Sequence, residues 1–358
     1  MKNFFTSLLG ALAALVIFAG GCLLLFIGFI GVIAAMGGGD KASPDLERGS
    51  YLVVDMSTNI TDSPPPVDLS AFGGHERTVQ LRTLTRSLRA AAKDEKIAGV
   101  FLTGDLNAAA FGSGYAALKE VRAALLEFKA SGKPITAYLT YATTKGYYLA
   151  SAASDLALDP YGMILMPGLA TEPMFYAGAF EKYGIGVQVT RVGKYKSAVE
   201  PFTRTAMSTE NREELQKLLG DLWADILADI APARGASVAE IQATVDAEGI
   251  IRPEPAKAAG LVDRIAYRDE IYDGLKAKTG RAGSKETFKQ ITLGDYAKLA
   301  KDVVDAPKKD GESSKFSGRG RIAVVYADGR SSMARAMWAT WAGADFRASC
   351  ASSGRTRM

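Results

Sequence analysis

The chain has 358 residues, which is enough length for one or two domains with a substantial buried core. Its formal net charge of +4 comes from the last 29 residues, so residues 1–329 carry 38 basic and 38 acidic groups and offer no basic surface for nucleic acid. A single histidine and two cysteines, Cys22 and Cys350, argue against a zinc site, a disulfide framework and a histidine-based triad. No cofactor or metal is expected, and any catalysis must use other groups.

An uncharged run from Leu8 to Gly39 is longer than the roughly 20 residues that span a bilayer. It predicts an uncleaved transmembrane anchor over residues 1–40. The alternative is a lipoprotein cleavage box at Ala-Gly-Gly-Cys, residues 19–22, but the apolar run continues well past Cys22. Charges flank the run on both sides, so the positive-inside rule favours a cytoplasmic N-terminus only weakly.

Strands and helices alternate through the next hundred residues. Buried strands are expected at 51–56, 97–103 and 135–140, and amphipathic helices at 79–94 and 114–129. This spacing is typical of βαβ units, with parallel strands and right-handed crossovers. The pattern therefore predicts an α/β layered domain, without choosing between doubly wound and spiral arrangements.

Two later stretches have an unusual composition. In residues 141–160 (YATTKGYYLASAASDLALDP) a Gly-aromatic pair opens a predicted helix of small residues at 150–153, and a short strand follows at 156–158. Residues 191–202 (RVGKYKSAVEPF) place two lysines after an apolar, strand-like run at 185–192. Ser208 is a plausible N-cap for the long helix that follows, whose apolar stripe is typical of a core or an oligomer interface.

Residues 191–202 resemble the lysine-bearing segment of the bacterial signal peptide peptidase family, the long membrane-bound type of protease IV. This resemblance implies that Lys196 is the general base of a Ser–Lys dyad, with Glu200 and Tyr195 as candidates for orienting its loop. Residues 141–160 resemble the family's nucleophile motif, in which Ser-Gly-Gly-aromatic opens a helix. Thr144 occupies the serine position, so it is interpreted as a retired copy that sets a helix start. Ser197 is not the nucleophile by this alignment.

The resemblance implies a Clp-protease/crotonase-like layered βαβ domain over residues 41–304, behind the N-terminal transmembrane helix. Within it, residues 256–263 (AKAAGLVD) resemble a segment shared by that superfamily and are interpreted as supporting the fold, with Gly260 capping a helix. A Pro/Gly/Ser-bearing linker is predicted at 305–320, and residues 321–329 resemble the first strand of a second peptidase domain.

Residues 330–358 change composition abruptly. They contain no Lys, Glu, Leu, Ile or Val, yet they include two of the three tryptophans and five arginines. A disordered basic tail is one reading, and a frameshift after Gly329 is the favoured hypothesis. Sequencing the gene around Gly329 tests it, since an intact single frame would contradict the frameshift.

The family resemblance implies a serine endopeptidase that degrades cleaved signal peptides and other membrane-associated peptides. It also implies a homo-oligomer, anchored by one pass in the bacterial inner membrane with its soluble body on the periplasmic side. In that family the serine comes from the second domain, and no Ser-Gly-Gly follows Gly329, so the chain is expected to be inactive alone. The alternative is a non-catalytic, membrane-anchored oligomerising or regulatory homologue. A crotonase-type acyl-CoA enzyme is a distant third, because it rests on shared fold alone.

Overall fold

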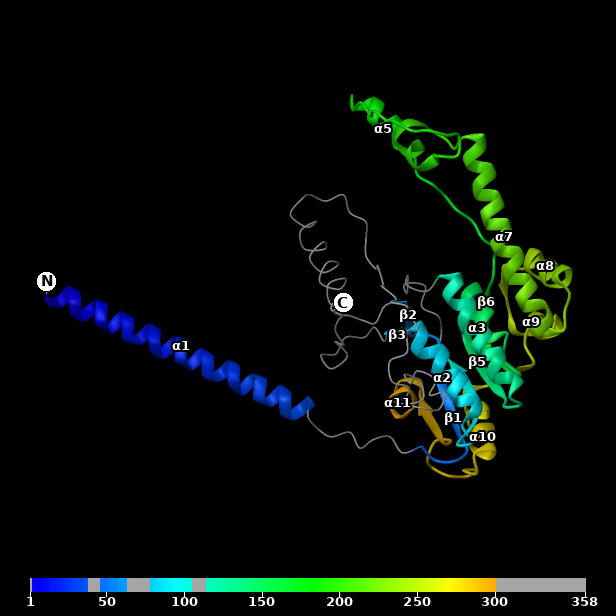
Figure 1. The fold of residues 1–358 in the computed structure, drawn as a ribbon, viewed down its shortest axis with the longest axis horizontal. Helices are drawn as coiled ribbons and strands as arrows, with labels where there is room; N and C mark the ends of the chain where they lie inside the picture. Colours follow the sequence, from blue (N-terminus) through cyan, green and yellow to red (C-terminus); the bar gives the residue numbers. More distant parts are fainter. Residues whose placement is uncertain (1, 38–45, 63–77, 105–113, 301–358) are drawn as a thin grey trace, which may run out of the picture.

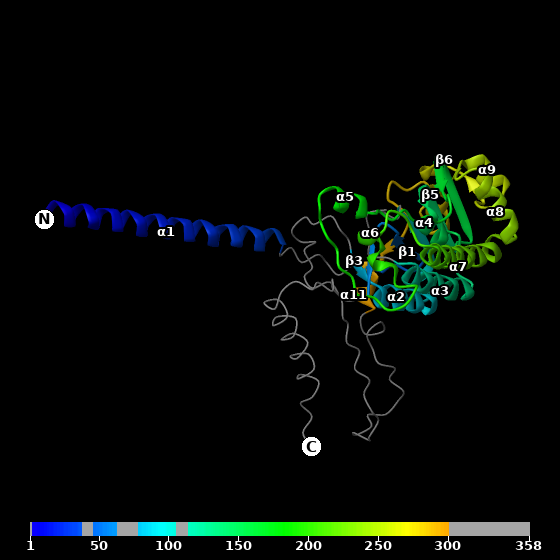
Figure 2. The ribbon, with the colours of Figure 1, turned by 90° about the horizontal axis from the view of Figure 1, so that it is seen from above.

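The computed structural model describes residues 2–37, 46–62, 78–104 and 114–300. The predicted linker at 305–320, the second-domain strand at 321–329 and the tail at 330–358 lie outside these ranges. Helix α1 (Lys2–Gly37) contains the segment Leu12–Phe29, whose mean hydropathy of 2.6 makes it long and apolar enough to cross a membrane. Figures 1 and 2 show it as one continuous helix. A signal sequence shares this length and composition.

A seven-stranded sheet forms the centre of the described body, in the order β7-β6-β5-β4-β1-β9 with β8 beside β6. Its strands are β1 (Ser50–Asp55), β4 (Ile97–Thr103), β5 (Ile135–Thr143), β6 (Asp155–Leu165), β7 (Ile250–Ile251), β8 (Arg264–Ile265) and β9 (Gln290–Thr292). All neighbours pair in parallel except β6 and β7. Strands β2 (Asn59–Thr61) and β3 (Thr78–Gln80) form a separate parallel pair. The predicted α/β class is confirmed.

Successive side chains of each strand point to opposite faces of the sheet, and apolar residues pack against both faces. Leu52 and Leu102 face a large apolar core beneath helices on one side, while Tyr51 and Phe101 face a smaller one on the other. The helices that contribute buried residues to the large core include α2 (Leu81–Lys93), α3 (Tyr115–Ala130), α4 (Thr144–Ala150) and α11 (Leu293–Leu299). Helix α10 (Arg268–Lys278) covers the smaller core.

Two local predictions were correct in the type of element but not in its extent, and a third was wrong. The helix predicted over the small residues 150–153 begins earlier, as α4, and ends at Ala150. The short strand at 156–158 is part of the much longer β6, which continues past Pro160 because Gly162 lets the backbones approach: a Cβ there would lie 2.7 Å from the Thr140 carbonyl oxygen. The strand-like run at 185–192 has no regular structure, since no strand lies beside it in the described residues.

The chain leaves the sheet after β6 and returns through a long helix, α7 (Thr209–Arg234). Only the C-terminal part of α7 packs into the large core, through Ile226, Leu227 and Ile230. We call residues 168–219, which lie between the sheet and this buried part, the arm. Figure 1 shows the arm projecting away from the sheet. It carries the short elements α5 (Ala177–Lys182), η2 (Ser197–Val199) and α6 (Glu200–Thr203).

Two further helices, α8 (Val238–Ala247) and α9 (Pro253–Ala258), follow α7 in the chain. Helix α8 begins with a capping box made by Ser237 and Glu240, and α9 follows β7. Gly260 follows Ala259, the C-cap residue of α9, and adopts a φ of +69°, in agreement with the capping role predicted for it. The Asp263 carboxylate accepts a hydrogen bond from the Leu156 N–H and pairs with Arg234. Residues 256–263 therefore tie α7 to β6.

Candidate active site

Lys196 lies in the arm, in the loop between the irregular run 185–192 and helix η2. The loop turns at Gly193, whose φ of +97° is unfavourable for other residues. The Lys196 stem lies over this glycine, since its Cγ is 3.9 Å from where a Cβ at position 193 would be. Both Lys196 and Lys194 are exposed. Within the described residues, nothing buries the Lys196 side chain.

Glu200 is the buried charge of this region, with 1 % of its side chain exposed. It accepts hydrogen bonds from the Ser208 N–H at 3.0 Å, the Ser208 hydroxyl at 2.5 Å and the Asn211 side-chain amide at 3.1 Å. Burial acts to raise the pKa of Glu200, but the hydrogen bonds from Ser208 and Asn211 outweigh it, so the pKa lies below its ordinary value. The carboxylate is therefore an anion fixed to the N-terminus of α7.

Arg191 connects this anion to the lysine loop. Its Nη1 donates a hydrogen bond to the Lys196 carbonyl oxygen at 3.1 Å and lies 3.8 Å from the Glu200 carboxylate. The hydrogen bond from the Arg191 side chain to the Lys196 carbonyl therefore spans the turn at Gly193. Sequence reasoning did not single out Arg191 or Asn211. Both lie within a dozen residues of Glu200, and the pairing of buried charges with nearby donors is the signal that could have found them.

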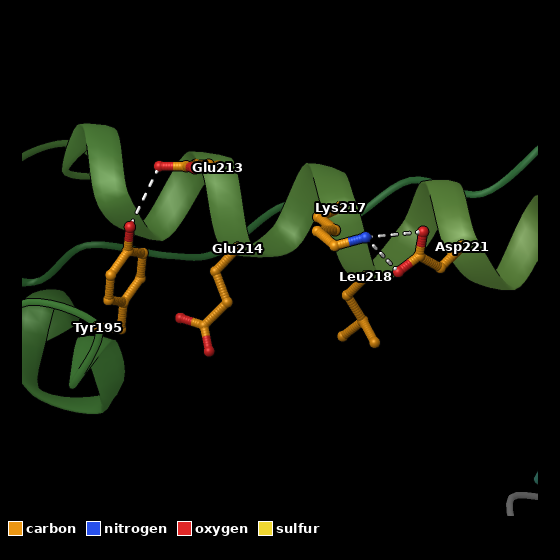
Figure 3. Close-up of a pocket in the computed structure, with 6 residues that line it drawn as sticks. All are labelled: Tyr195, Glu213, Glu214, Lys217, Leu218 and Asp221. Carbon is orange, nitrogen blue, oxygen red and sulfur yellow. Dashed lines mark hydrogen bonds and ion pairs between the residues drawn. The ribbon is translucent and has the colours of Figure 1, made fainter.

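Tyr195 makes a weaker contact with the same helix. Its side chain is 53 % exposed, and its hydroxyl donates to Glu213 at 3.4 Å. The charge of Glu213, with some desolvation, raises the pKa of Tyr195. Figure 3 shows Tyr195 at one end of a surface cavity of about 300 Å³ along α7. The other lining residues are Glu213, Glu214, Lys217, Leu218 and Asp221. Of the two predicted orienting residues, only Glu200 is buried.

Thr144 is the first residue of α4 and is buried in the body. The N-cap of α4 is Thr143, whose hydroxyl accepts from the Gly146 N–H at 3.4 Å, so the predicted helix start is correct but the capping residue lies one position earlier. The following side chains, Tyr147 and Tyr148, are also buried, and the Tyr147 hydroxyl donates to the Leu261 carbonyl. The start of α4, with Thr144, is therefore part of the packed interior of the body.

Arg122 of α3 joins α4 to the base of α7. Its guanidinium is buried, and it donates to the Tyr148 carbonyl, to the Ser151 hydroxyl at 2.7 Å and to the Asp229 carbonyl at 2.7 Å. The Tyr148 hydroxyl in turn donates to the Asp229 carboxylate at 2.7 Å. Figure 2 shows α3, α4 and α7 lying together at this point. The buried part of α7, from which the arm projects, is thus held by a buried cation that sequence reasoning did not identify.

Comparison with known proteins identifies the family. Residues 127–281 match the model of peptidase family S49, a span that contains α4, the lysine loop and α7. This span of the chain carries the peptidase family S49 match. The chain is 32 % identical over 284 residues to the chloroplastic serine protease SPPA of Arabidopsis thaliana, covering 79 % of this chain and 39 % of that protein.

Two bacterial proteins are similar to the chain over a longer span. Protease 4 of Salmonella typhi is 30 % identical over 321 residues, covering 85 % of this chain and 49 % of that protein. Protease 4 of Haemophilus influenzae is 28 % identical over 322 residues, covering 85 % and 50 %. The chain therefore spans between two fifths and one half of the length of these relatives. The resemblance to the signal peptide peptidase family that residues 191–202 carry is confirmed at the level of the family.

Proposed function

We propose that this chain is the lysine-bearing part of a serine endopeptidase of the Ser–Lys dyad type, which degrades cleaved signal peptides. One observation carries the proposal: Lys196 is exposed on the arm, while the backbone beside it is tied to a buried carboxylate. A lysine with a fixed backbone and an exposed side chain suits a base if another segment brings both the nucleophile and the surface that buries the lysine. The S49 relatives, which are named as proteases, support this reading.

In the proposed reaction, neutral Lys196 accepts the serine proton as the serine oxygen attacks the scissile carbonyl carbon. The tetrahedral intermediate collapses, and the leaving amine takes the proton from the lysine ammonium. Lys196 then accepts a proton from water, whose oxygen attacks the acyl-enzyme ester, and the serine oxygen leaves with that proton. A lysine serves as such a base when it is desolvated, because burial favours its neutral form. The surface that supplies the serine would also cover Lys196.

The nucleophile in this proposal comes from outside the 358 residues. Thr144, which occupies the serine position of the family motif, is buried at a helix start, and no Ser-Gly-Gly occurs in the sequence. We therefore expect the chain to hydrolyse no peptide alone.

Helix α1 is proposed as a single-pass anchor in the bacterial inner membrane, with the body on the periplasmic side. Its apolar length and the bacterial relatives support this placement. Signal peptides left in the bilayer, and other membrane-associated peptides, are the proposed substrates. A homo-oligomer is also proposed, because the arm exposes large apolar side chains that another copy would cover, among them Tyr183, Ile185 and Val192.

The test combines the full chain in detergent micelles with a serine-bearing S49 segment and a fluorogenic signal-peptide substrate. Replacing Lys196 by Ala should lower kcat by about 10²–10⁴-fold, the usual contribution of a general base. Lys194→Ala is the matched control, since Lys194 is an exposed lysine two residues away, and it should retain activity. Hydrolysis by the chain without the serine segment, or full activity of Lys196→Ala, would contradict the proposal.

The second candidate is a non-catalytic, membrane-anchored homologue that oligomerises with or regulates an S49 partner. The exposure of Lys196 favours it, because an exposed lysine is not in the environment that a general base needs. Analytical ultracentrifugation with the activity assay separates the two: oligomers whose combined activity does not depend on Lys196 would favour this candidate.

A further inference from the structure

The polar cluster beneath Lys196 has more connections than a helix cap requires. Helix α7 is already capped by Ser208, whose hydroxyl accepts a hydrogen bond from the Asn211 N–H at 3.1 Å. Glu200 adds a buried anion to this N-terminus, where the helix dipole also stabilises negative charge. The Ser208 side chain satisfies one free N–H group of this helix start, and Glu200 accepts a hydrogen bond from another, the Ser208 N–H. Capping alone leaves the ion pair between Glu200 and Arg191 unexplained.

The connection from Glu200 to the lysine loop supplies an explanation. Arg191 is the cation within ion-pair distance of Glu200 among the described residues, and the same Nη1 atom donates to the Lys196 carbonyl oxygen. Arg191 is 40 % exposed, so on its own it would hold the loop weakly against solvent. The buried carboxylate gives this guanidinium a fixed partner, which in turn fixes the backbone of Lys196.

We propose that Glu200 is a positioning residue for Lys196, acting through Arg191. The carboxylate is fixed by Ser208 and Asn211 of α7, Arg191 spans from it to the Lys196 carbonyl, and the turn at Gly193 brings the two ends together. This inference rests on the proposed function, in which Lys196 is the base. In this proposal the ion pair between Glu200 and Arg191 orients Lys196. The hydrogen bond from Tyr195 to Glu213, which also joins the loop to α7, does not orient it.

Hydrogen exchange of the full chain in detergent micelles measures the positioning directly and needs no serine partner. Glu200→Gln keeps the size of the side chain but removes the charge, so amides in residues 191–199 should exchange about ten- to a hundredfold faster, as expected for losing hydrogen bonds to a charged group. Arg191→Gln should give the same increase, and the double variant no more than either single one, because both break one connection.

Tyr195→Phe is the matched control, since it removes the exposed 3.4 Å bond between the same loop and the same helix. It should leave exchange in residues 191–199 unchanged. Unchanged exchange in Glu200→Gln would overturn the inference. Equal acceleration in Tyr195→Phe would also overturn it, because the loop would then depend on contacts in general. Amides of β4 and β5 should not change in any variant, which excludes general unfolding.

The assembled protease supplies the second measurement. Glu200→Gln and Arg191→Gln should lower kcat about tenfold or more with KM unchanged, since a misplaced base affects the chemical step. A fall in kcat for Lys196→Ala with full activity in both positioning variants would overturn the inference and keep the proposed function. No effect of Lys196→Ala would refute the proposed function instead, while the exchange experiment would still test whether Glu200 orders the loop.

Discussion

The sheet and the arm of this protein are held together by different interactions. In the sheet, successive residues of β1 and β4 enter two apolar cores, and most of these side chains are fully buried. In the arm, large apolar side chains such as Tyr183 and Val192 are exposed, and the fully buried charge is Glu200. The body is thus stabilised by hydrophobic burial, and the lysine loop by a small polar cluster.

This difference separates the stability of the body from the order of the candidate site. The free energy from apolar burial grows with the buried area, and most of that area lies in the body. The body can therefore be stable whether or not the lysine loop of the arm is ordered. A buried carboxylate with several donors contributes geometry as well as energy, because its hydrogen bonds are directional. The arm is also the region whose apolar surface remains for another molecule to cover. Its substitution effects should therefore be local, in contrast to those in the sheet.

The largest effect should come from the aromatic cluster on the smaller core. Phe101 is 1 % exposed and packs edge-on against Phe288, with ring centroids 5.7 Å apart. Phe101→Ala should lower the free energy of unfolding by about 3–5 kcal/mol. The matched substitution in the arm is Phe202→Ala, since Phe202 also stacks on other rings but is 44 % exposed.

Urea denaturation followed by circular dichroism measures both variants. Phe202→Ala should change the free energy of unfolding of the body by about 0.5 kcal/mol or less, the usual effect of a surface substitution. A loss in Phe202→Ala as large as that in Phe101→Ala would show that the arm folds as one unit with the sheet.

A smaller effect is expected where the arm is anchored. Arg122→Met should cost about 2–4 kcal/mol, because the Tyr148 and Asp229 carbonyls and the Ser151 hydroxyl lose a charged donor inside the protein. Arg89→Met is the control: Arg89 pairs with Glu127 on the surface, with about half of each side chain exposed, and should cost less than about 1 kcal/mol. Thermal unfolding of both variants compares the two arginines. Equal losses would mean that burial of Arg122 does not determine its contribution.

The same contrast explains what could be predicted from sequence. Strand 97–103 was predicted with the observed bounds, and the helix at 114–129 was displaced by one residue, because hydrophobic periodicity directly reflects burial in the two cores. The run at 185–192 has the same apolar alternation but no neighbouring strand, so periodicity alone predicted a strand wrongly. Alternation shows that a segment can pair, and the partner must come from the rest of the structure.

The candidate site was predictable only in part. Residues 191–202 carried the resemblance that singled out Lys196, and Ser208 is the N-cap of α7 as predicted. The role of Arg122 depends on a contact that sequence spacing does not encode, since its partner Asp229 is 107 residues further along the chain. The exposure of Lys196 likewise follows from how the arm leaves the sheet. The assignment of Lys196 as the base stays a prediction.

The smallest effect should come from acid, and it is confined to the lysine loop. Burial acts to raise the pKa of Glu200, but the hydrogen bonds from Ser208 and Asn211 hold it below its ordinary value of 4.5, to which it should return when these bonds open. The charge of Glu200 therefore stabilises the closed loop fully above pH 4.5, and this stabilisation is lost as the pH falls through the folded-state pKa. Two cations face this carboxylate: Arg191 lies 3.8 Å from it, and the charge of Arg204 helps to lower its pKa.

Hydrogen exchange of residues 191–199 from pH 6 to pH 3, corrected for intrinsic exchange, should show protection that declines below about pH 4.5. Glu200→Gln removes the titrating group, so its exchange should be fast already at pH 6 and should show no further decline. Other carboxylates with lowered pKa, such as Asp263 and Glu127, lie in the body and are present in both proteins, so the difference between the two profiles isolates Glu200. If exchange depended on pH in the same way in the unmodified protein and in Glu200→Gln, the buried carboxylate would not order the loop. The proposed difference between an apolar body and an arm held by ionic contacts would then be wrong for Glu200.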